Sequence, residues 1–414
     1  MSRFLFVVPP LTGHINPAAA VAAELAARGH EVAWAGRPAI VERLAGERPR
    51  VYGCAGPDHL AGRPPQLRGV AALKFLWADF LGPLAEAMAP GVAAAITAFR
   101  PDLVVADQQT VAGALVAERL GVPFATSSTT SAELTDSMAG LPGVDSWLTA
   151  LLARLRERIG DPAATHDPRF SPLLTLAFTT PELTGPCLTP GTVLRFVGPA
   201  LAGRRAPAGD FPWRWLDLAP GTAPVLITLG TANADAGARF LAESVAAVRA
   251  RAGRLRAVVC DPGGLLGAVA PGPDVLVRPS LPQVALLERM AAVVCHAGHN
   301  TVTESLWHGV PLVVAPIRDD QPVVAAQVVG AGAGVRVKFA RAGRERIGAA
   351  LDAVVTDPAY RDAARRIRDA FRAAGGESAA AAHLEELAAA PGPAARTGAM
   401  TPLPPTEGHA HAGQ

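Results

Sequence analysis

The sequence is short of lysine and of net charge, and each shortage excludes a class of function. Lys74 and Lys338 are the only lysines among 38 basic residues. Neither follows a glycine, so the phosphate-binding loop G-x-x-x-x-G-K-[ST] is absent. With 36 acidic residues the formal net charge is +2, which gives no electrostatic basis for binding nucleic acid or an anionic membrane. No apolar run approaches the roughly 18 residues of a membrane helix, so we expect no membrane span.

Cysteine is also scarce. The four cysteines are far apart and form no C-x-x-C pair, which favours buried thiols in a reducing cytosol over disulfides or a metal site. They are Cys54, Cys187, Cys260 and Cys295. The N-terminal "MSRFLFVVPP" has a short apolar run with no cleavage-site pattern after it, so we predict a strand there, not a signal peptide. We therefore expect a cytoplasmic protein.

Apolar residues, by contrast, make up 50% of the 414 residues, a length for which two domains of about 200 residues are expected. Apolar strands alternate with helices in the first part of the chain. These elements are predicted at 4–8, 18–29, 30–36, 101–107, 110–121 and 122–128. Such alternation predicts an α/β fold with a parallel sheet covered by helices on both faces.

A second, independent series begins near residue 224, after a stretch rich in Pro and Gly that predicts a linker. Its strands and helices are predicted at 224–230, 238–252, 255–260, 274–278, 282–290, 291–298 and 310–316. We therefore predict a first domain over 1–198, a linker over 199–222, a second domain over 223–376, a terminal helix over 377–390 and a disordered tail over 391–414. A cleft is expected between the two doubly wound domains.

Two stretches, 55–100 and 128–195, fit the alternation poorly and carry scattered aromatic side chains. Insertions of this kind are candidate walls for an apolar ligand. The candidates are Phe75, Trp77, Phe80 and Trp147. Packing in the domain core is the alternative explanation for each of them.

The segment "CHAGHNTVTESLWHGVPLVVAPIRDDQ" (295–321) gathers three histidines and an Asp-Asp-Gln. A buried strand leads into a helix there, so residues 296–300 form a turn at the carboxyl end of a strand, where α/β sheets bind ligands. The free N–H groups of the helix make an anion site, and Gly298 allows an anion to approach the backbone. A capping box, Thr301-x-x-Glu304, is the alternative. It leaves His296 unexplained.

A dinucleotide is disfavoured as the anion. The fingerprint G-x-G-x-x-G is missing after the first strand, where "PPLTGHINP" stands instead. In "VVGAGAGV" (328–335) a helical pattern precedes Gly330, Gly332 and Gly334, so these residues are predicted to form a helix C-terminus and turn.

The stretch "HAGHNTVTESLWHGVPLVVAPIRDDQPVVAAQVV" resembles the donor-binding signature of family-1 UDP-glycosyltransferases, and "PPLTGHINPAAAVAAELAARGHEV" resembles their bacterial macrolide-type branch. The resemblance extends to about residue 390. It implies a GT-B fold, in which two Rossmann-like domains face each other across a cleft. The first domain would bind a small apolar acceptor and the second a nucleotide-sugar, and the terminal helix would cross back to the first domain.

The resemblance also implies roles for individual residues of the second domain. A diphosphate would lie against His296, Gly298, Asn300 and Thr301, with Gly230 and Thr231 on its other side, and His299 would make only a loop contact at the donor site. Glu304 would bind the ribose, and Asp320 and Gln321 the sugar hydroxyls. Leu281 and Gln283 would frame the base. Many relatives carry a tryptophan before this Pro-Gln pair and this chain has "SLPQ", so UDP and TDP both remain open.

His14 would be the catalytic base of a direct displacement with inversion, because an imidazole with a pKa near 6.5 suits removal of a hydroxyl proton. Asp107, at the end of a strand on the same sheet edge, would orient and stabilise the imidazolium. No metal is expected, since no two aspartates form the Asp-x-Asp of metal-dependent sugar transferases. No cofactor is expected beyond the nucleotide-sugar co-substrate.

Two other functions are compatible with the same fold. A GT-B-like sugar-nucleotide epimerase would share the nucleotide site but needs acidic residues around the sugar in place of a His–Asp pair. A non-catalytic auxiliary subunit would not need His14, Asp107, Asp320 and Gln321 together. The sequence leaves open the acceptor, the sugar, O- against C-glycosylation, and a monomer against a homodimer.

Overall fold

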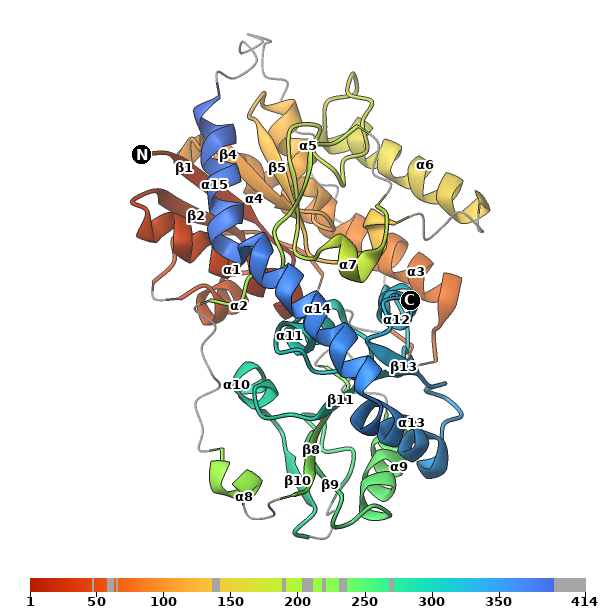
Figure 1. The fold of residues 1–414 in the computed structure, drawn as a ribbon. Coiled ribbons are helices and arrows are strands. Elements are labelled where there is room, and N and C mark those ends of the chain that lie inside the picture. The colour runs from red at the N-terminus through yellow and green to blue at the C-terminus, as the bar shows by residue number, and fades with distance from the viewer. Residues whose placement is uncertain are drawn as a thin grey trace.

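The computed structural model describes residues 1–46, 48–57, 63–64, 66–135, 142–187, 191–202, 211–217, 221–230, 237–267 and 272–390. Two parallel β-sheets, each flanked by helices on both faces, form the two halves of the molecule (Figure 1). The predicted α/β class is therefore confirmed.

The first sheet contains strands β1 (Arg3–Val7), β2 (Glu31–Gly36), β3 (Val51–Gly53), β4 (Leu103–Asp107), β5 (Phe124–Ser128), β6 (Thr175–Ala177) and β7 (Leu194–Phe196). Their order is β3-β2-β1-β4-β5-β6-β7, and every pairing is parallel. The helical segments of this half are α1 (Thr12–Ala27), α2 (Pro38–Leu44), α3 (Gly69–Phe75), the π-helical η1 (Leu76–Leu81), α4 (Gly82–Phe99), α5 (Val111–Arg119), the 3₁₀ turn η2 (Ala132–Leu134), α6 (Pro142–Ile159) and α7 (Pro181–Thr184).

The second sheet contains β8 (Ala223–Thr228), β9 (Leu255–Cys260), β10 (Val275–Arg278), β11 (Ala292–Cys295), β12 (Leu312–Val314) and β13 (Gly334–Arg336), in the parallel order β10-β9-β8-β11-β12-β13. The remaining helices are α8 (Trp213–Asp217), α9 (Ala238–Arg249), α10 (Gln283–Leu287), α11 (His299–Trp307), α12 (Gln321–Gly330), α13 (Arg344–Thr356), α14 (Pro358–Ala374) and α15 (Gly376–Ala389).

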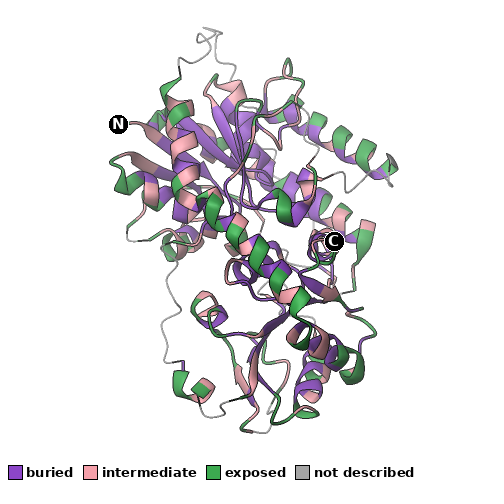
Figure 2. Ribbon diagram, viewed as in Figure 1, coloured by how far each residue is buried: buried purple, intermediate pink, exposed green. Residues whose placement is uncertain are grey.

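Each sheet is buried on both faces, as its uninterrupted apolar strands predict. On β1, Leu5 and Val7 belong to the hydrophobic cluster that includes α4 and α5, whereas Phe4 and Phe6 belong to the cluster that includes α1 and α15. Successive side chains of a strand point to opposite faces, so one strand supplies both clusters. The central strands of each sheet are mostly buried, and the exposed residues lie mainly on helices and loops (Figure 2).

The predicted strands and most helices are found within a few residues of their expected bounds, but two regions differ. The first helix begins at Thr12, earlier than the predicted residue 18, and places Pro17 inside the helix. Residues 69–99, predicted to be irregular, are continuously helical. This stretch is apolar and long enough to cross a membrane, but 56% of its most apolar window is buried inside the protein. It is a core helix of the first half.

The terminal helix α15 returns to the first half, as the resemblance implies. The chain leaves α14, which packs against the second sheet, through Gly375 and Gly376, whose φ angles are 89° and 57°. Only glycine adopts such angles readily. Leu384 of α15 is then fully buried beside α1, and α15 lies along the first domain in Figure 1. At the edge of this contact Glu385 accepts a hydrogen bond from Arg28 at 2.8 Å.

The four cysteines form no disulfide. Cys295 is buried, whereas Cys54, Cys187 and Cys260 are only partly buried. The prediction of four buried thiols is therefore correct for one of them. Burial raises the pKa of the Cys295 thiol to about 12, so this group is an inert part of the core.

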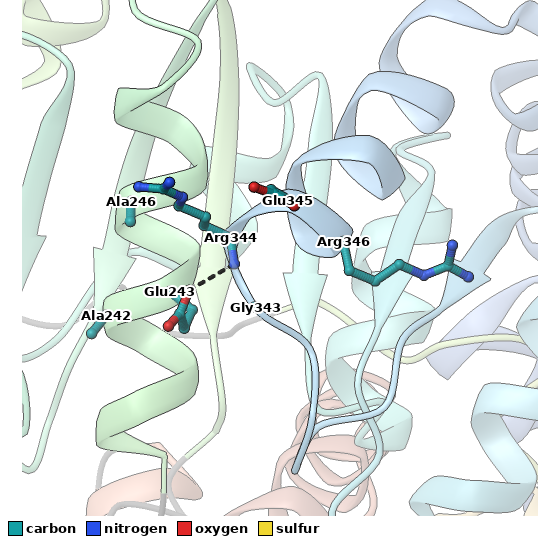
Figure 3. Close-up of a pocket in the computed structure, with 7 residues that line it drawn as sticks. All are labelled: Ala242, Glu243, Ala246, Gly343, Arg344, Glu345 and Arg346. Carbon is teal, nitrogen blue, oxygen red and sulfur yellow. Dashed lines mark hydrogen bonds between the residues drawn. The ribbon is translucent and has the colours of Figure 1, made fainter.

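A shallow hollow lies in the second domain between α9 and the start of α13 (Figure 3). The Glu243 carboxylate fills the anion-binding position at that helix start, accepting a hydrogen bond from the backbone N–H of Arg344 at 2.7 Å. The residues that line the hollow include none of the predicted site residues.

We predict that Leu384→Ala destabilises the protein by about 2–5 kcal/mol, because it leaves a cavity where α15 packs on the first domain. Leu173→Ala is the matched control, because Leu173 is 38% exposed. Its truncation should change the free energy of unfolding by less than about 0.5 kcal/mol. Urea unfolding followed by circular dichroism measures both. Equal losses in the two variants would show that α15 is not anchored through Leu384.

Candidate active site

Four strands bring the predicted site residues together. In each sheet the strand order reverses beside its first strand, between β1 and β4 in one and between β8 and β11 in the other. Ligands of open α/β sheets bind at the carboxyl ends of strands at such points. His14 follows β1, Asp107 ends β4, Gly230 follows β8 and His296 follows β11.

His14 and Asp107 form a hydrogen-bonded pair. The Nδ1 atom of His14 lies 3.0 Å and 3.1 Å from the two carboxylate oxygens of Asp107. Asp107 is 2% exposed, and its Oδ1 also accepts the backbone N–H of Gln109 at 2.9 Å. None of the described residues hydrogen-bonds to Nε2 of His14, so the imidazole presents this nitrogen to a ligand.

Two opposing effects set the pKa of His14. Burial alone would lower it, but the negative charge of Asp107 and the hydrogen bond to it outweigh burial and raise the pKa above 6.5. Asp320 and Glu133 add smaller effects in the same direction. The site therefore favours the protonated imidazolium more than water does.

Thr129 is a third member of this group that sequence reasoning missed. Its hydroxyl donates to Oδ2 of Asp107 at 2.8 Å and lies 2.7 Å from Nδ1 of His14. Thr129 and the Gln109 N–H thus bond to different oxygens of the Asp107 carboxylate. The sequence signal is the run of hydroxyl residues "SSTTS" at the end of β5.

The first turns of α1, which carry His14, contain Pro17 and therefore lack one backbone hydrogen bond. A proline has no N–H to donate to the carbonyl four residues earlier, which here is that of Gly13. That carbonyl instead accepts a hydrogen bond from the side-chain amide of Asn300 in α11 at 2.7 Å. The second domain thus holds the helical turn that carries His14.

His296 lies in a tight space between two glycines. A Cβ atom on Gly298 would come within 2.3 Å of its Nε2, and one on Gly230, whose φ is 71°, within 2.7 Å of its Cε1. Burial, with a smaller effect of the Arg318 charge, lowers the pKa of His296 to about 4. His296 is therefore neutral at pH 7. No described residue bonds to its buried Nδ1.

The capping box is not formed. Helix α11 begins at His299 and its N-cap is Gly298, without a side-chain cap, so Thr301 is inside the first turn. No side chain caps the first N–H groups of this helix in the part of the chain that the structure describes. The residue before the cap, Ala297, has a φ of 66°, a conformation that glycine adopts more readily than alanine.

The remaining residues predicted to bind a nucleotide line the same side of the second domain. Glu304 is 4% exposed and accepts a hydrogen bond from the side-chain amide of Gln283 at 2.7 Å. Leu281, two residues before Gln283 in the sequence, is buried in the core of the second domain. Thr231 lies outside the described residues.

His299 contacts the first domain. Its Nδ1 lies 3.2 Å from the Ser131 hydroxyl, which also donates to Gln327 at 2.6 Å, and its Nε2 lies 3.3 Å from the carbonyl oxygen of Phe178. Burial lowers the pKa of His299 to about 4. Its side chain thus belongs to the contact between the domains.

Asp320 and Gln321 stand where α12 begins. Oδ2 of Asp320 accepts a hydrogen bond from the Thr130 hydroxyl at 2.7 Å, and burial raises its pKa to about 6. The side-chain oxygen of Gln321 accepts the backbone N–H groups of Ile317 and Arg318 at 2.9 Å and 3.1 Å, so Gln321 shapes the turn before it.

The four aromatic candidates separate into two pairs. Trp77 and Phe80 are 1% and 2% exposed and belong to the core of the first domain, because η1 turns them inward. Their burial favours packing in the domain core, the alternative explanation, over a role in lining a ligand site. Phe75 and Trp147 are only partly buried, and both remain candidates.

The described residues contain no group of three His, Cys, Asp or Glu side chains able to hold a metal ion.

The two facing Rossmann-like sheets match the GT-B fold of solved glycosyltransferases. A solved structure described as the glycotransferase of kitacinnamycin superposes with a TM-score of 0.76 over 93% of this chain and 98% of its own, at 25% identity.

Sequence comparison gives the family. The family model for UDP-glucoronosyl and UDP-glucosyl transferase matches residues 263–371. The 4'-demethylrebeccamycin synthase of Lentzea aerocolonigenes is 31% identical, over 90% of this chain and 96% of its own. The demethyllactenocin mycarosyltransferase of Streptomyces fradiae is 29% identical, over 94% of this chain and 87% of its own. The chain belongs to family 1 of the UDP-glycosyltransferases, in the bacterial natural-product branch.

We predict that Asp107→Asn lowers the pKa of His14, because burial then acts against only the smaller effects of Asp320 and Glu133. The raised pKa in the wild type stabilises the folded state below pH 6.5, and this contribution is lost as the pH rises through the folded value. NMR titration of labelled histidine measures the change.

Asp362→Asn, at an exposed carboxylate of α14, is the control and should leave the titration unaltered. An unchanged pKa in Asp107→Asn would contradict the assigned pair.

Proposed function

We propose that this glycosyltransferase moves a sugar from a UDP- or TDP-sugar to a hydroxyl of a small, largely apolar natural product, with inversion at the anomeric carbon. The observation that carries the proposal is the His14–Asp107 pair, whose Nδ1 contacts leave Nε2 for a substrate. The names of the two relatives, a rebeccamycin-type synthase and a mycarosyltransferase, support an acceptor of this kind.

The proposed step is a single displacement. The acceptor oxygen forms a bond to the anomeric carbon as the bond from that carbon to the diphosphate oxygen breaks, and the acceptor proton passes to Nε2 of His14. Asp107 stabilises the imidazolium that forms and holds its Nδ1–H in place. Thr129 and the N–H of Gln109 keep the carboxylate oriented.

The leaving diphosphate would lie at the start of α11. The free N–H groups and the dipole of this helix favour an anion, and Gly298 and Gly230 leave the backbone accessible. His296 supplies a neutral hydrogen bond, because its pKa is about 4. These groups stabilise the developing charge without any metal, so we propose none.

The other donor groups would follow along the same sheet edge. We place the ribose at Glu304, the base at Leu281 and Gln283, and the sugar at Asp320 and Gln321. Phe75 and Trp147 are the proposed walls of the acceptor site, and the acceptor enters from the first domain.

We predict that His14→Gln lowers kcat by about 10²–10⁴-fold, the usual contribution of a general base, with a smaller change in the donor KM. His383→Gln is the control, because His383 lies on α15 beside Glu386 and outside the site. Release of nucleoside diphosphate in the presence of an acceptor measures turnover. Undiminished transfer by His14→Gln would exclude it as the base.

We predict that UDP or TDP raises the melting temperature of the wild type, by mass action on the folded state, and that Gly298→Ala loses most of this shift. The added Cβ would meet His296 at 2.3 Å. The control is Gly330→Ala in α12, where an added Cβ meets nothing within 4 Å. Equal shifts in the two variants would place the diphosphate elsewhere.

Comparing the shifts given by UDP-glucose, TDP-glucose and TDP-deoxysugars identifies the base and narrows the sugar. A protein that binds the nucleotide-sugar but transfers to no acceptor, while raising the activity of a partner, would be an auxiliary subunit.

A further inference from the structure

An arginine of the first domain forms a two-point ion pair with the turn that begins α12. Arg63 lies in the connection between β3 and α3. Its Nη1 donates to Oδ2 of Asp319 at 2.9 Å, and its Nη2 donates to Oδ1 of the same carboxylate. The Arg63 side chain is 4% exposed and that of Asp319 19%. A bidentate pair of this kind fixes orientation as well as distance.

Asp319 needs such support because its backbone is strained. Its φ is 57°, in the left-handed region that residues other than glycine occupy at a cost. The adjoining residues are Arg318, whose backbone N–H is held by Gln321, and Asp320. The conformation of Asp319 therefore determines where the Asp320 carboxylate and the first turn of α12 lie.

The charge of Arg63 is required for the same turn. Asp319 and Asp320 are adjacent carboxylates, and after burial and the hydrogen bond from Thr130, the nearby Asp319 charge is the next influence on the pKa of Asp320. A guanidinium on Asp319 offsets the repulsion between the two. Both carboxylates are thus held by first-domain side chains, Asp319 by Arg63 and Asp320 by Thr130.

We propose that Arg63 is a positioning residue for the donor sugar: the first domain completes the sugar site through the Arg63–Asp319 pair. This inference rests on the proposed function, in which Asp320 binds the sugar. The second domain alone binds the nucleotide, and the sugar is bound only when Arg63 holds the 317–321 turn.

The same guanidinium lies 5.9 Å from the ring of Phe75, one of the two remaining candidates for the acceptor wall. Arg63 thus stands between the acceptor side and the sugar side of the cleft.

The test compares binding of UDP-glucose and TDP-glucose with binding of UDP and TDP by calorimetry, in the whole protein. Arg63→Met keeps the apolar stem and removes the charge. We expect it to weaken binding of the nucleotide-sugar by about 30-fold or more, as loss of one partner from a buried ion pair does, and to leave nucleoside diphosphate binding unchanged. Arg63→Lys, which keeps the charge without the two-point geometry, should be intermediate.

Asp319→Asn and the double variant complete a cycle. If Arg63 acts on sugar binding through its pair with Asp319, the double variant Arg63→Met with Asp319→Asn binds the nucleotide-sugar no more weakly than Arg63→Met alone. Arg156→Met is the matched control, because Arg156 forms a similarly buried pair with Glu118 in the first domain. It should lower stability without changing the preference for nucleotide-sugar over nucleoside diphosphate.

Equal weakening of nucleotide-sugar and nucleoside diphosphate binding in Arg63→Met would overturn the inference, and so would an unchanged affinity for both. A wild type that binds the nucleotide-sugar no more tightly than the nucleoside diphosphate would also overturn it. Failure of the proposed function is a separate result: the wild type would bind the nucleotide-sugar and Arg63→Met would weaken it, yet no sugar would be transferred.

Discussion

The active site depends on hydrogen bonds between the facing edges of the two sheets. Three consecutive side chains after β5 contribute to this arrangement. Thr129 bonds to the His14–Asp107 pair within the first domain, whereas Thr130 bonds to Asp320 and Ser131 to Gln327 and His299 of the second domain. One short segment of the first domain therefore contacts both the His14–Asp107 pair and the second domain. Displacement chemistry requires such alignment, because errors of about 1 Å between reacting groups are costly.

The pKa values show how the same geometry separates the roles of the histidines. Burial acts on His14, His296 and His299 alike and disfavours the charged ring. Only His14 has a carboxylate within hydrogen-bonding distance, so only His14 has its pKa raised. The sequence alone cannot distinguish these three residues by type, and the difference lies in what each ring contacts.

The parts of the fold that could be predicted are those that depend on local pattern. Runs of apolar residues predicted the strands. Because parallel strands end at common edges of a sheet, the positions of Asp107 and His296 followed from the predicted strands. Contacts between distant residues leave no such pattern, and Arg63 with Asp319, 256 residues apart, was missed for this reason. The predicted start of the first helix at residue 18 was wrong, because α1 begins at Thr12 and includes Pro17, and the Gly13 carbonyl left without its helical donor accepts a hydrogen bond from Asn300.

The return of α15 to the first domain has a consequence for biosynthesis. Residues 376–389 pack beside a helix made from residues 12–27, so the second domain is enclosed within the chain of the first. During synthesis the first sheet emerges early, yet the apolar face that α15 covers stays open until almost the entire chain has left the ribosome. The nascent protein must keep this face from aggregating throughout translation of its second half.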